Sequence, residues 1–170
     1  EVSYIGGRNE SGQRHGRGIM KYDNGCRYVG RFVNDKRHGF GKVWYPKELG
    51  IYTGHWHKNK RCGEGTMSFA NGDVYKGQWS MDMPNGVGKL TLTNGETYKG
   101  DFVNQQKQGR GVYKWPNGDT YEGKWKKDVR HGAGLLISAD EDACKQFYRE
   151  GMLLLWGKGA TSVQDVSSSS

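Results

Sequence analysis

Residues 121–125 read Tyr-Glu-Gly-Lys-Trp, and this Tyr-x-Gly-x-aromatic pattern returns along most of the chain at intervals of 23 or 24 residues. The Tyr-x-Gly segments begin at Tyr4, Tyr28, Tyr52, Tyr75, Tyr98 and Tyr121. The residue two places after the glycine is aromatic in five of these six units, and Arg8 is the exception. A fixed period of this length is the signature of a repeat protein in which each unit is one supersecondary element.

Each unit also contains a Gly-x-Gly segment, and the chain as a whole has 28 glycines in 170 residues. The segments lie at Gly16/Gly18, Gly39/Gly41, Gly63/Gly65, Gly86/Gly88, Gly109/Gly111 and Gly132/Gly134. Glycine inside a strand is destabilising by roughly 0.5–1 kcal/mol relative to alanine, so its regular use needs compensation. We expect an aromatic ring from a neighbouring strand to lie over the bare glycines, the arrangement called aromatic rescue.

Turn-forming segments divide each unit into two strands. Asn-Gly pairs favour a tight hairpin because both residues tolerate positive φ. They occur at Asn24-Gly25, Asn71-Gly72, Asn94-Gly95 and Asn117-Gly118. The two longer units carry their extra residue within 8–12 and 46–50, and insertions are tolerated best in loops. We therefore predict strand, turn, strand, turn in every unit.

Alternation along a strand assigns its side chains to two faces. In the unit that begins at Tyr75, the tyrosine shares one face with Gly77 and Trp79, whereas Lys76 and Gln78 point to the other. The pattern predicts one face of aromatic and aliphatic side chains and one solvated face. We expect an all-β fold: an elongated, single-layer, twisted antiparallel sheet of tandem β-hairpins, trough-shaped and closed by an atypical C-terminal cap.

The repeat decays after Leu135, and two interpretations of the next segment stay open. Residues 138–159 can be a degenerate seventh hairpin, because terminal repeats are often atypical and act as caps. Alternatively, residues 138–141 (Ser-Ala-Asp-Glu) match a capping box at the start of a short helix. We favour the hairpin, so that the array fills residues 1–159, and we expect the serine-rich tail 160–170 to be disordered.

The unit resembles the MORN repeat: Tyr-x-Gly-x-Trp, then a basic loop with His-Gly-x-Gly, then Asn-Gly. Residues 121–134 match this pattern closely. The resemblance is close from residue 1 to about 137 and weak over 138–159. Departures from the pattern are Arg8 in place of the first aromatic residue, and Cys62, Asn85 and Gln108 in place of histidine.

The resemblance to the MORN family carries its own expectations. It implies an elongated antiparallel sheet that holds protein partners, in proteins of junctional membrane complexes, cilia and cytoskeletal collars, or beside catalytic domains. Some members are thought to bind acidic phospholipids and some self-associate, so a homodimer is a further expectation. The repeats themselves are not known to catalyse reactions.

The net charge of +8 favours acidic partners: anionic lipid, nucleic acid or an acidic protein surface. Nucleic acid is disfavoured because the known recognition motifs are missing. No apolar run is long enough for a membrane span, and the N-terminus shows no signal-peptide pattern. Cys26, Cys62 and Cys144 are odd in number and occupy unrelated repeat positions, which indicates a reducing compartment. We predict a cytoplasmic location with membrane or cytoskeletal association.

The sequence offers no convincing catalytic or metal site. His15, His38 and His131 occupy one equivalent repeat position, which favours a structural role in turns. His55 and His57 share the predicted solvated face, but a structural zinc site normally needs four ligands. Nucleotide-binding loops and nucleophile elbows are missing as well. We therefore expect no enzyme activity, no cofactor and no metal.

Two sets of side chains are candidates for binding. The first lines the aromatic face and would form a groove for a peptide or helix of a partner protein: Tyr45, Trp56, Phe69, Trp79, Phe102, Trp115 and Trp125. The second would form a ladder of positive charge along one edge: Arg14, Lys36, Arg37, Lys60, Arg61, Lys107 and Arg130. The main hypothesis is a protein-binding scaffold or adaptor. The alternative is peripheral binding to acidic phospholipids, where each basic residue near the membrane contributes roughly 1 kcal/mol.

Overall fold

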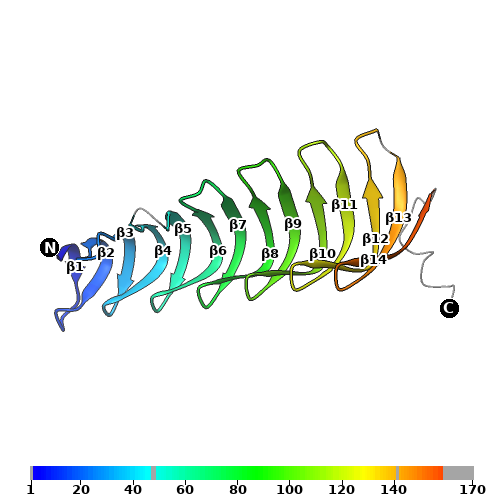
Figure 1. The fold of residues 1–170 in the computed structure, drawn as a ribbon. Helices are drawn as coiled ribbons and strands as arrows, with labels where there is room; N and C mark the ends of the chain where they lie inside the picture. Colours follow the sequence, from blue (N-terminus) through cyan, green and yellow to red (C-terminus); the bar gives the residue numbers. More distant parts are fainter. Residues whose placement is uncertain (1, 47–48, 141, 159–170) are drawn as a thin grey trace. The chain divides into compact units, whose positions relative to one another are not determined.

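The computed structural model describes residues 2–46, 49–140 and 142–158. These residues form 14 strands of one antiparallel sheet, in chain order from β1 to β14 (Figure 1). The strands are β1 (Ser3–Arg8), β2 (Arg14–Lys21), β3 (Arg27–Val33), β4 (Lys36–Trp44), β5 (Ile51–His57), β6 (Lys60–Ser68), β7 (Val74–Ser80), β8 (Met83–Thr91), β9 (Thr97–Val103), β10 (Gln106–Lys114), β11 (Thr120–Lys126), β12 (Val129–Ile137), β13 (Ala143–Arg149) and β14 (Met152–Lys158). The described ranges contain no helix, so the prediction of an all-β hairpin sheet is confirmed.

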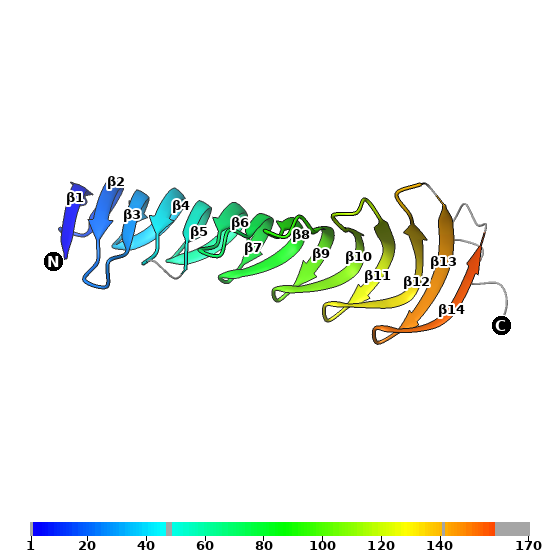
Figure 2. The same ribbon diagram turned by 45° about the horizontal axis from the view of Figure 1, so that its top comes forward.

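The chain divides into two compact units, residues 1–84 and 85–170. Within each unit, strands that follow one another in the sequence pair side by side. The connecting turns alternate between the two edges of the sheet, and Figure 2 shows this alternation from a second direction. Each unit is therefore a meander in which contacts are made between neighbouring hairpins.

Facing glycines set the register within each unit. In the first unit, Gly30 on β3 faces both Gly18 on β2 and Gly41 on β4. In the second, Gly111 on β10 faces both Gly100 on β9 and Gly123 on β11. A continuous row of bare backbone therefore crosses the strands of each unit.

Tyrosine rings cover this glycine row. The ring of Tyr28 lies over Gly30 on its own strand and over Gly41 on the next. A Cβ added to Gly30 would stand 2.6 Å from the ring carbon Cζ, and one added to Gly41 would stand 2.5 Å from Cε2. The hydroxyl of Tyr28 donates to the carbonyl of Arg31 at 3.0 Å. The expected ring over glycine is confirmed, with one tyrosine covering two strands.

The face that carries these tyrosines, which we term the ring face, holds the core. Tyr28 and Tyr52 are fully buried, and Trp56 is 2% exposed. The ring of Trp56 packs edge-on against Tyr28 of the preceding repeat, with centroids 5.6 Å apart. Its Nε1 donates to the carbonyl of Gly41 at 3.3 Å. Each repeat is thus stabilised mainly by its neighbour, as in other repeat proteins.

Two kinds of turn connect the strands, and they correct one detail of the prediction. The two-residue turns, such as Asn34-Asp35 with φ of 46° and 65°, have positive φ at both residues and are of type I′. In the Asn-Gly turns only the glycine has positive φ, for example 83° at Gly25. There the Asn24 carboxamide oxygen accepts a hydrogen bond from the backbone N–H of Cys26 at 3.0 Å. The Asn-Gly pairs do mark turns, as predicted, but they lie in loops longer than a two-residue hairpin turn.

The two one-residue insertions lie in turns, as predicted. The first lies between β1 and β2, where the Asn9 N–H donates to the Gln13 carbonyl at 2.9 Å. The second lies between β4 and β5, where the Tyr45 N–H donates to the Gly50 carbonyl at 2.9 Å. Residues 47 and 48 of this turn lie outside the described residues.

The seventh unit is a hairpin, so the alternative of a short helix is wrong. Its strands β13 and β14 extend the sheet beyond β12. Tyr148 replaces the usual tryptophan. Its ring packs edge-on against Tyr121, with centroids 5.7 Å apart, and so covers the core tyrosine of the preceding repeat. Gln146 stands at the glycine position facing Gly134, where it is 8% exposed and accepts a hydrogen bond from the Tyr148 hydroxyl at 2.6 Å. The tail 160–170 lies outside the described residues.

The face opposite the rings is not uniformly solvated, contrary to the prediction. On β1–β4 it carries Ile5, Ile19, Val29 and Phe40, and Ile5 and Phe40 are 71% and 59% exposed. Each of these apolar residues stands one position away from a ring-face residue, so strand alternation points its side chain away from the core. The opposite face of the first two hairpins therefore has an apolar surface of its own.

Candidate functional site

The groove candidates divide into two groups according to burial. Four of them are enclosed in the ring-face core and are at most 6% exposed: Trp56, Trp79, Phe102 and Trp125. The other three lie at the turn edge of the ring face. Phe69 is 38% exposed, and Tyr45 and Trp115 are half-buried. Of the candidate groove, only this second group offers an appreciable surface to another molecule.

Five of the basic candidates lie on the aromatic rings. The guanidinium carbon of Arg37 is 4.2 Å from the ring centroid of Trp56, and that of Arg61 is 4.4 Å from Trp79. Arg14, Lys107 and Arg130 lie over rings in the same way. Such cation–π contacts stabilise by roughly 0.5–2 kcal/mol, more when the cation is desolvated. These charges therefore contribute to the packing of the repeats.

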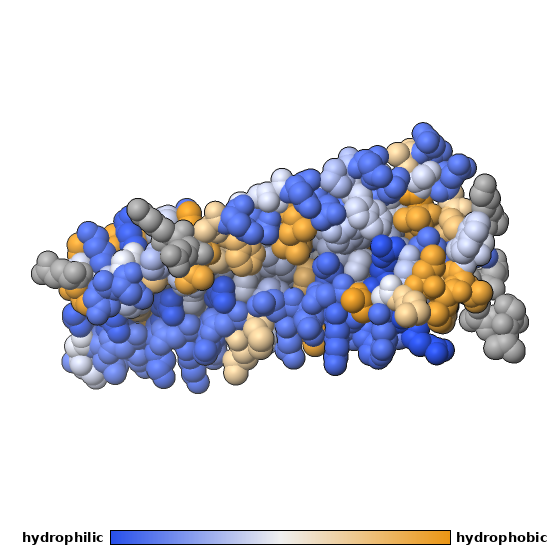
Figure 3. Space-filling view, viewed as in Figure 1, coloured by the Kyte–Doolittle hydropathy of each residue, from blue (hydrophilic) through white to orange (hydrophobic). Residues whose placement is uncertain are grey.

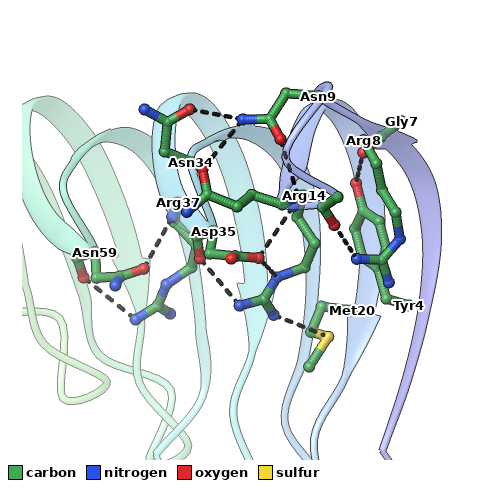
Figure 4. A network of polar contacts seen from close by, with 12 residues as sticks. Tyr4, Gly7, Arg8, Asn9, Arg14, Met20, Asn34, Asp35, Arg37 and Asn59 are labelled. Atoms are coloured by element: carbon green, nitrogen blue, oxygen red, sulfur yellow. Dashed lines mark hydrogen bonds and ion pairs between the residues drawn. The ribbon is translucent and has the colours of Figure 1, made fainter.

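The same basic residues join successive turns into a polar network, which we term the turn ladder (Figure 4). The backbone N–H of Arg14 donates to the Asp35 carboxylate at 3.0 Å, and the Asp35 N–H donates back to the Arg14 carbonyl at 3.0 Å. Arg37 and Asn59 repeat this exchange one hairpin further on, at 2.8 and 3.0 Å. The turn ladder satisfies turn backbone that would otherwise need water, and sequence reasoning missed it.

The remaining basic candidates, Lys36 and Lys60, are exposed. The Lys60 ammonium pairs with the Asp82 carboxylate at 2.8 Å, and its side chain is 58% exposed. An exposed pair of this kind contributes only about 0–1 kcal/mol. Of the seven basic candidates, these two present their charge most freely to solvent.

Acid should weaken the turn ladder through Asp82. Burial by itself raises the pKa of this carboxyl, but hydrogen bonds from the Arg61 backbone and the Lys60 ammonium outweigh burial and leave the pKa below its ordinary value. The resulting stabilisation is present above the unfolded-state pKa, about 3.9, and is lost as pH falls through the folded-state pKa. We expect Asp82→Asn to reduce the stability difference between pH 7 and pH 3 in urea unfolding.

Asn59 indicates that asparagine fits this position, since it accepts the equivalent bond from Arg37 in the neighbouring turn. The control is Asp23→Asn, which makes the same substitution in an exposed turn. An identical acid-induced loss of stability in the Asp82→Asn variant and the parent would contradict this role of the carboxyl.

His38, His57 and His131 have local partners, whereas the buried Nδ1 of His15 has no hydrogen-bond partner among the described residues. The Nδ1 of His131 lies 3.4 Å from the backbone nitrogen of Glu150, and Gln108, at the equivalent repeat position, accepts from the Lys127 N–H at 3.0 Å. The rings of His38 and His57 are 5.0 Å apart. Among the described residues, no group of three His, Cys, Asp or Glu side chains is placed to hold a metal ion.

A recess of about 750 Å³ lies on the face opposite the rings, over β1–β4. Its apolar lining comes from Ile5, Ile19, Val29 and Phe40. Its polar lining comes from Arg17, Arg31 and Lys42, with backbone of the glycine row between them. The sequence showed these residues but gave no reason to group them, because the face was predicted to be solvated.

A second apolar surface lies on β14. Its residues 152–156 read Met-Leu-Leu-Leu-Trp and are between 42% and 69% exposed. Figure 3 shows apolar side chains gathered near the C-terminal end of the described chain. Within the described ranges there is no helix that could cross a membrane.

The repeat geometry agrees with a comparison against known protein families. The profile of the MORN repeat matches residues 10–27, 28–48, 52–74, 75–97, 98–120 and 121–143. The chain belongs to the MORN-repeat family. The matched segments cover six tandem repeats, and the terminal hairpin β13–β14 extends past the last of them.

Among curated proteins, the chain is similar to segments of much longer relatives. It is 40% identical over 72 residues to Alsin of Homo sapiens, which covers 40% of this chain and 4% of Alsin. It is 42% identical over 53 residues to the inactive protein tyrosine kinase pTKL of Plasmodium berghei, which covers 31% of this chain and 4% of that protein. The chain thus spans only a small part of these relatives.

Two solved structures are similar to the chain at low identity. The first is the TCP domain of SAS-4 from Drosophila melanogaster, in complex with a proline-rich motif of Ana2. It has a TM-score of 0.47 and 15% identity, and the match covers 86% of this chain and 90% of that one. The second is the TCP10 domain of Danio rerio CPAP with a STIL peptide. It has a TM-score of 0.29 and 14% identity, with coverage of 92% and 100%.

Proposed function

We propose that this MORN-repeat chain is a non-catalytic scaffold that holds a segment of a partner protein along its sheet. The buried rings and the turn ladder serve the folding of the repeats themselves. The described residues outside the core and the turn ladder offer surfaces rather than a reactive site. Binding by surface complementarity is the function that such an architecture supports best.

The observation that carries this proposal is the open apolar surface of a single-layer sheet. No second layer of described residues covers either face, yet Ile5, Phe40 and Phe69 expose large apolar side chains. Exposed apolar groups that are clustered and rimmed by polar residues often mark sites of protein interaction. Membership of a family built from such repeats is consistent with the same role.

Site-specific photo-crosslinking tests the scaffold function. A photoreactive phenylalanine analogue would replace Phe40 on one face, Phe69 at the edge of the ring face, or Asn71 in an exposed turn as a control. We expect one of the two sheet positions, but not the turn position, to crosslink to a protein that also binds the purified chain directly. Failure of every crosslinked protein to bind the purified chain would remove the proposal.

The alternative of acidic phospholipid binding draws little support from the basic candidates. Five of the seven are engaged with rings and turns, which leaves Lys36 and Lys60 as the most accessible charges. Vesicle flotation of the Lys36→Glu/Lys60→Glu variant is the appropriate test of phospholipid binding by the basic candidates at the sheet edge. Cytoplasmic location, cytoskeletal association and homodimer formation remain predictions.

A further inference from the structure

The strands β1–β4 carry basic but no acidic side chains. Their opposite face carries Arg17, Arg31 and Lys42 within one recess. In the second unit the same face mixes charges, with Asp101 on β9 and Glu122 on β11 beside lysines. The recess over β1–β4 therefore gathers three cations with no carboxylate among its lining residues.

The register arranges the recess as two adjoining rows. In one row Ile5 faces Ile19, Ile19 faces Val29, and Val29 faces Lys42. Directly facing side chains on antiparallel strands have Cβ atoms about 4.5–5.5 Å apart. The row is therefore a continuous aliphatic strip that ends at Lys42, whose ammonium lies 4.6 Å from the centroid of the Trp44 ring.

In the second row Arg17 faces Arg31, and Phe40 follows on β4. The Arg31 stem lies close to Gly39, where an added Cβ would stand 3.4 Å from its Cδ. Gly39 has a φ of 65°, and the absence of a side chain there leaves room for the stem. The two guanidinium groups thus border the aliphatic strip, and Phe40 stands at the end of their row.

No ion pair with another described residue neutralises these cations. The ion pairs among the described residues join Arg14 to Asp35 and join Lys60 and Arg61 to Asp82. None of the described pairs includes Arg17, Arg31 or Lys42. Two adjacent guanidinium groups without counter-ions repel each other, and a carboxylate placed between them would relieve that repulsion.

We propose that this recess binds an acidic peptide segment of a partner protein, with an aliphatic or aromatic side chain on the strip and carboxylates on Arg17, Arg31 and Lys42. The inference rests on the scaffold function and adds the face of the sheet and the chemistry of the partner. Exposed Phe40 and the arginines are residue types that often dominate binding energy. Charge complementarity in addition steers the encounter and selects the partner.

A protein segment fits the recess better than a membrane surface does. The recess is partly open to solvent, and its volume of about 750 Å³ lies within the range of ligand clefts. The apolar strip forms part of the lining rather than a ridge between the cations. A side chain on a flexible backbone can enter and fill such a space, whereas a layer of headgroups would contact mainly its rim.

The test is selection from a phage-displayed library of random dodecapeptides on the immobilised full chain, with the Arg31→Glu/Phe40→Ser variant as the counter-selection target. We expect the peptides that prefer the parent chain to be acidic and to carry at least one Leu, Ile, Phe or Trp. A synthetic copy of the leading peptide should bind the variant at least about tenfold more weakly in fluorescence anisotropy. Its affinity should also fall as salt screens the charges.

Matched controls separate the recess from general effects of charge and folding. Lys124→Glu changes an exposed cation at the repeat position of Arg31, and Val112→Ser changes an exposed aliphatic side chain at the repeat position of Ile19. Both should alter the affinity less than about twofold. Enriched peptides without acidic character, or an equal affinity for the parent and the Arg31→Glu/Phe40→Ser variant, would overturn the proposal.

Two further outcomes keep this inference distinct from the scaffold function. If a crosslinked protein partner binds in a manner sensitive to Phe69→Ser and insensitive to Arg31→Glu/Phe40→Ser, the scaffold function stands and the recess proposal fails. If Arg31→Glu/Phe40→Ser abolishes flotation with phosphatidylserine vesicles while no acidic peptide is enriched, the recess is a membrane contact, and the peptide proposal fails.

Discussion

Gly100→Val is expected to lower the free energy of unfolding by about 3 kcal/mol. A Cβ at Gly100 would stand 2.5 Å from the Cα of Gly111 on the next strand and 2.6 Å from the hydroxyl oxygen of Tyr98. Tyr98 is 1% exposed, and its ring packs against Phe102 and Trp125, so it has no free direction in which to move. Urea unfolding followed by tryptophan fluorescence measures the loss.

The matched control is Gly157→Val on β14. An added Cβ at Gly157 meets nothing within 4 Å, and valine is favoured in strands. We expect this variant to stay within about 0.5 kcal/mol of the parent chain. Equal losses in the two variants would mean that glycine in these strands is needed for its backbone freedom and not for the space it leaves.

A double-mutant cycle separates the ring from the backbone. At Gly111 the nearest atoms to an added Cβ all belong to the Tyr98 ring, whereas at Gly100 they include backbone of the facing strand. Gly111→Ala should therefore cost less in a Tyr98→Ala background than in the parent. Gly100→Val should keep most of its cost in that background, because its clash with the backbone of Gly111 remains. Simple additivity of Gly111→Ala and Tyr98→Ala would argue against the ring lying over this glycine.

The repeat period and strand alternation were sufficient to predict the ring face. Tyr, Gly and Trp recur at i, i+2 and i+4, and a period of two can place them on only one side of a strand. The type I′ turns were harder to recognise, because pairs such as Lys58-Asn59 and Met81-Asp82 lack the glycine that usually marks positive φ. The structure shows φ of 46° and 73° for the first pair and 49° and 70° for the second.

The position of the basic residues could not be predicted from charge alone. A β-bulge between Gly30 and Phe32 shifts the register so that Arg37 faces Phe32, which brings its guanidinium onto the ring face. From the sequence we predicted that Arg37 lies in a basic loop at the edge of the sheet. The spacing of 22 residues between Arg37 and Asn59 was an available signal, but its meaning depends on which turns become neighbours in the sheet.

The recess was not predicted, because strand alternation led to the general rule that the face opposite the rings is polar and solvated. That rule holds where the middle residue of Gly-x-Gly is Glu64 or Arg110, and it fails at Phe40. Comparing equivalent positions across repeats, rather than averaging them, would have identified Phe40 as an exception, together with Val87 and Ala133. The apolar strip formed by Ile5, Ile19 and Val29 depends in addition on strand pairing, which the structure supplies.

Arg61→Glu is expected to cost about 3 kcal/mol of stability, whereas Lys60→Glu beside it should cost at most about 1 kcal/mol. The Arg61 guanidinium lies 4.4 Å from the Trp79 ring centroid and donates to the Asp82 carbonyl at 2.7 Å. The replacement removes both contacts and adds a carboxylate beside that of Asp82. Lys60 loses only an exposed ion pair.

The difference in stability between Arg61→Glu and Lys60→Glu decides which variants can be used to test membrane binding by the basic candidates. A loss of flotation in Arg61→Glu would coincide with disrupted packing, so that Lys36→Glu/Lys60→Glu gives the interpretable result. Urea unfolding of Arg61→Glu and Lys60→Glu, followed by far-ultraviolet circular dichroism, measures the two costs. Equal stability of the two variants would show that Arg61 is a solvated surface charge. Arg61 would then again be a candidate for binding anionic groups.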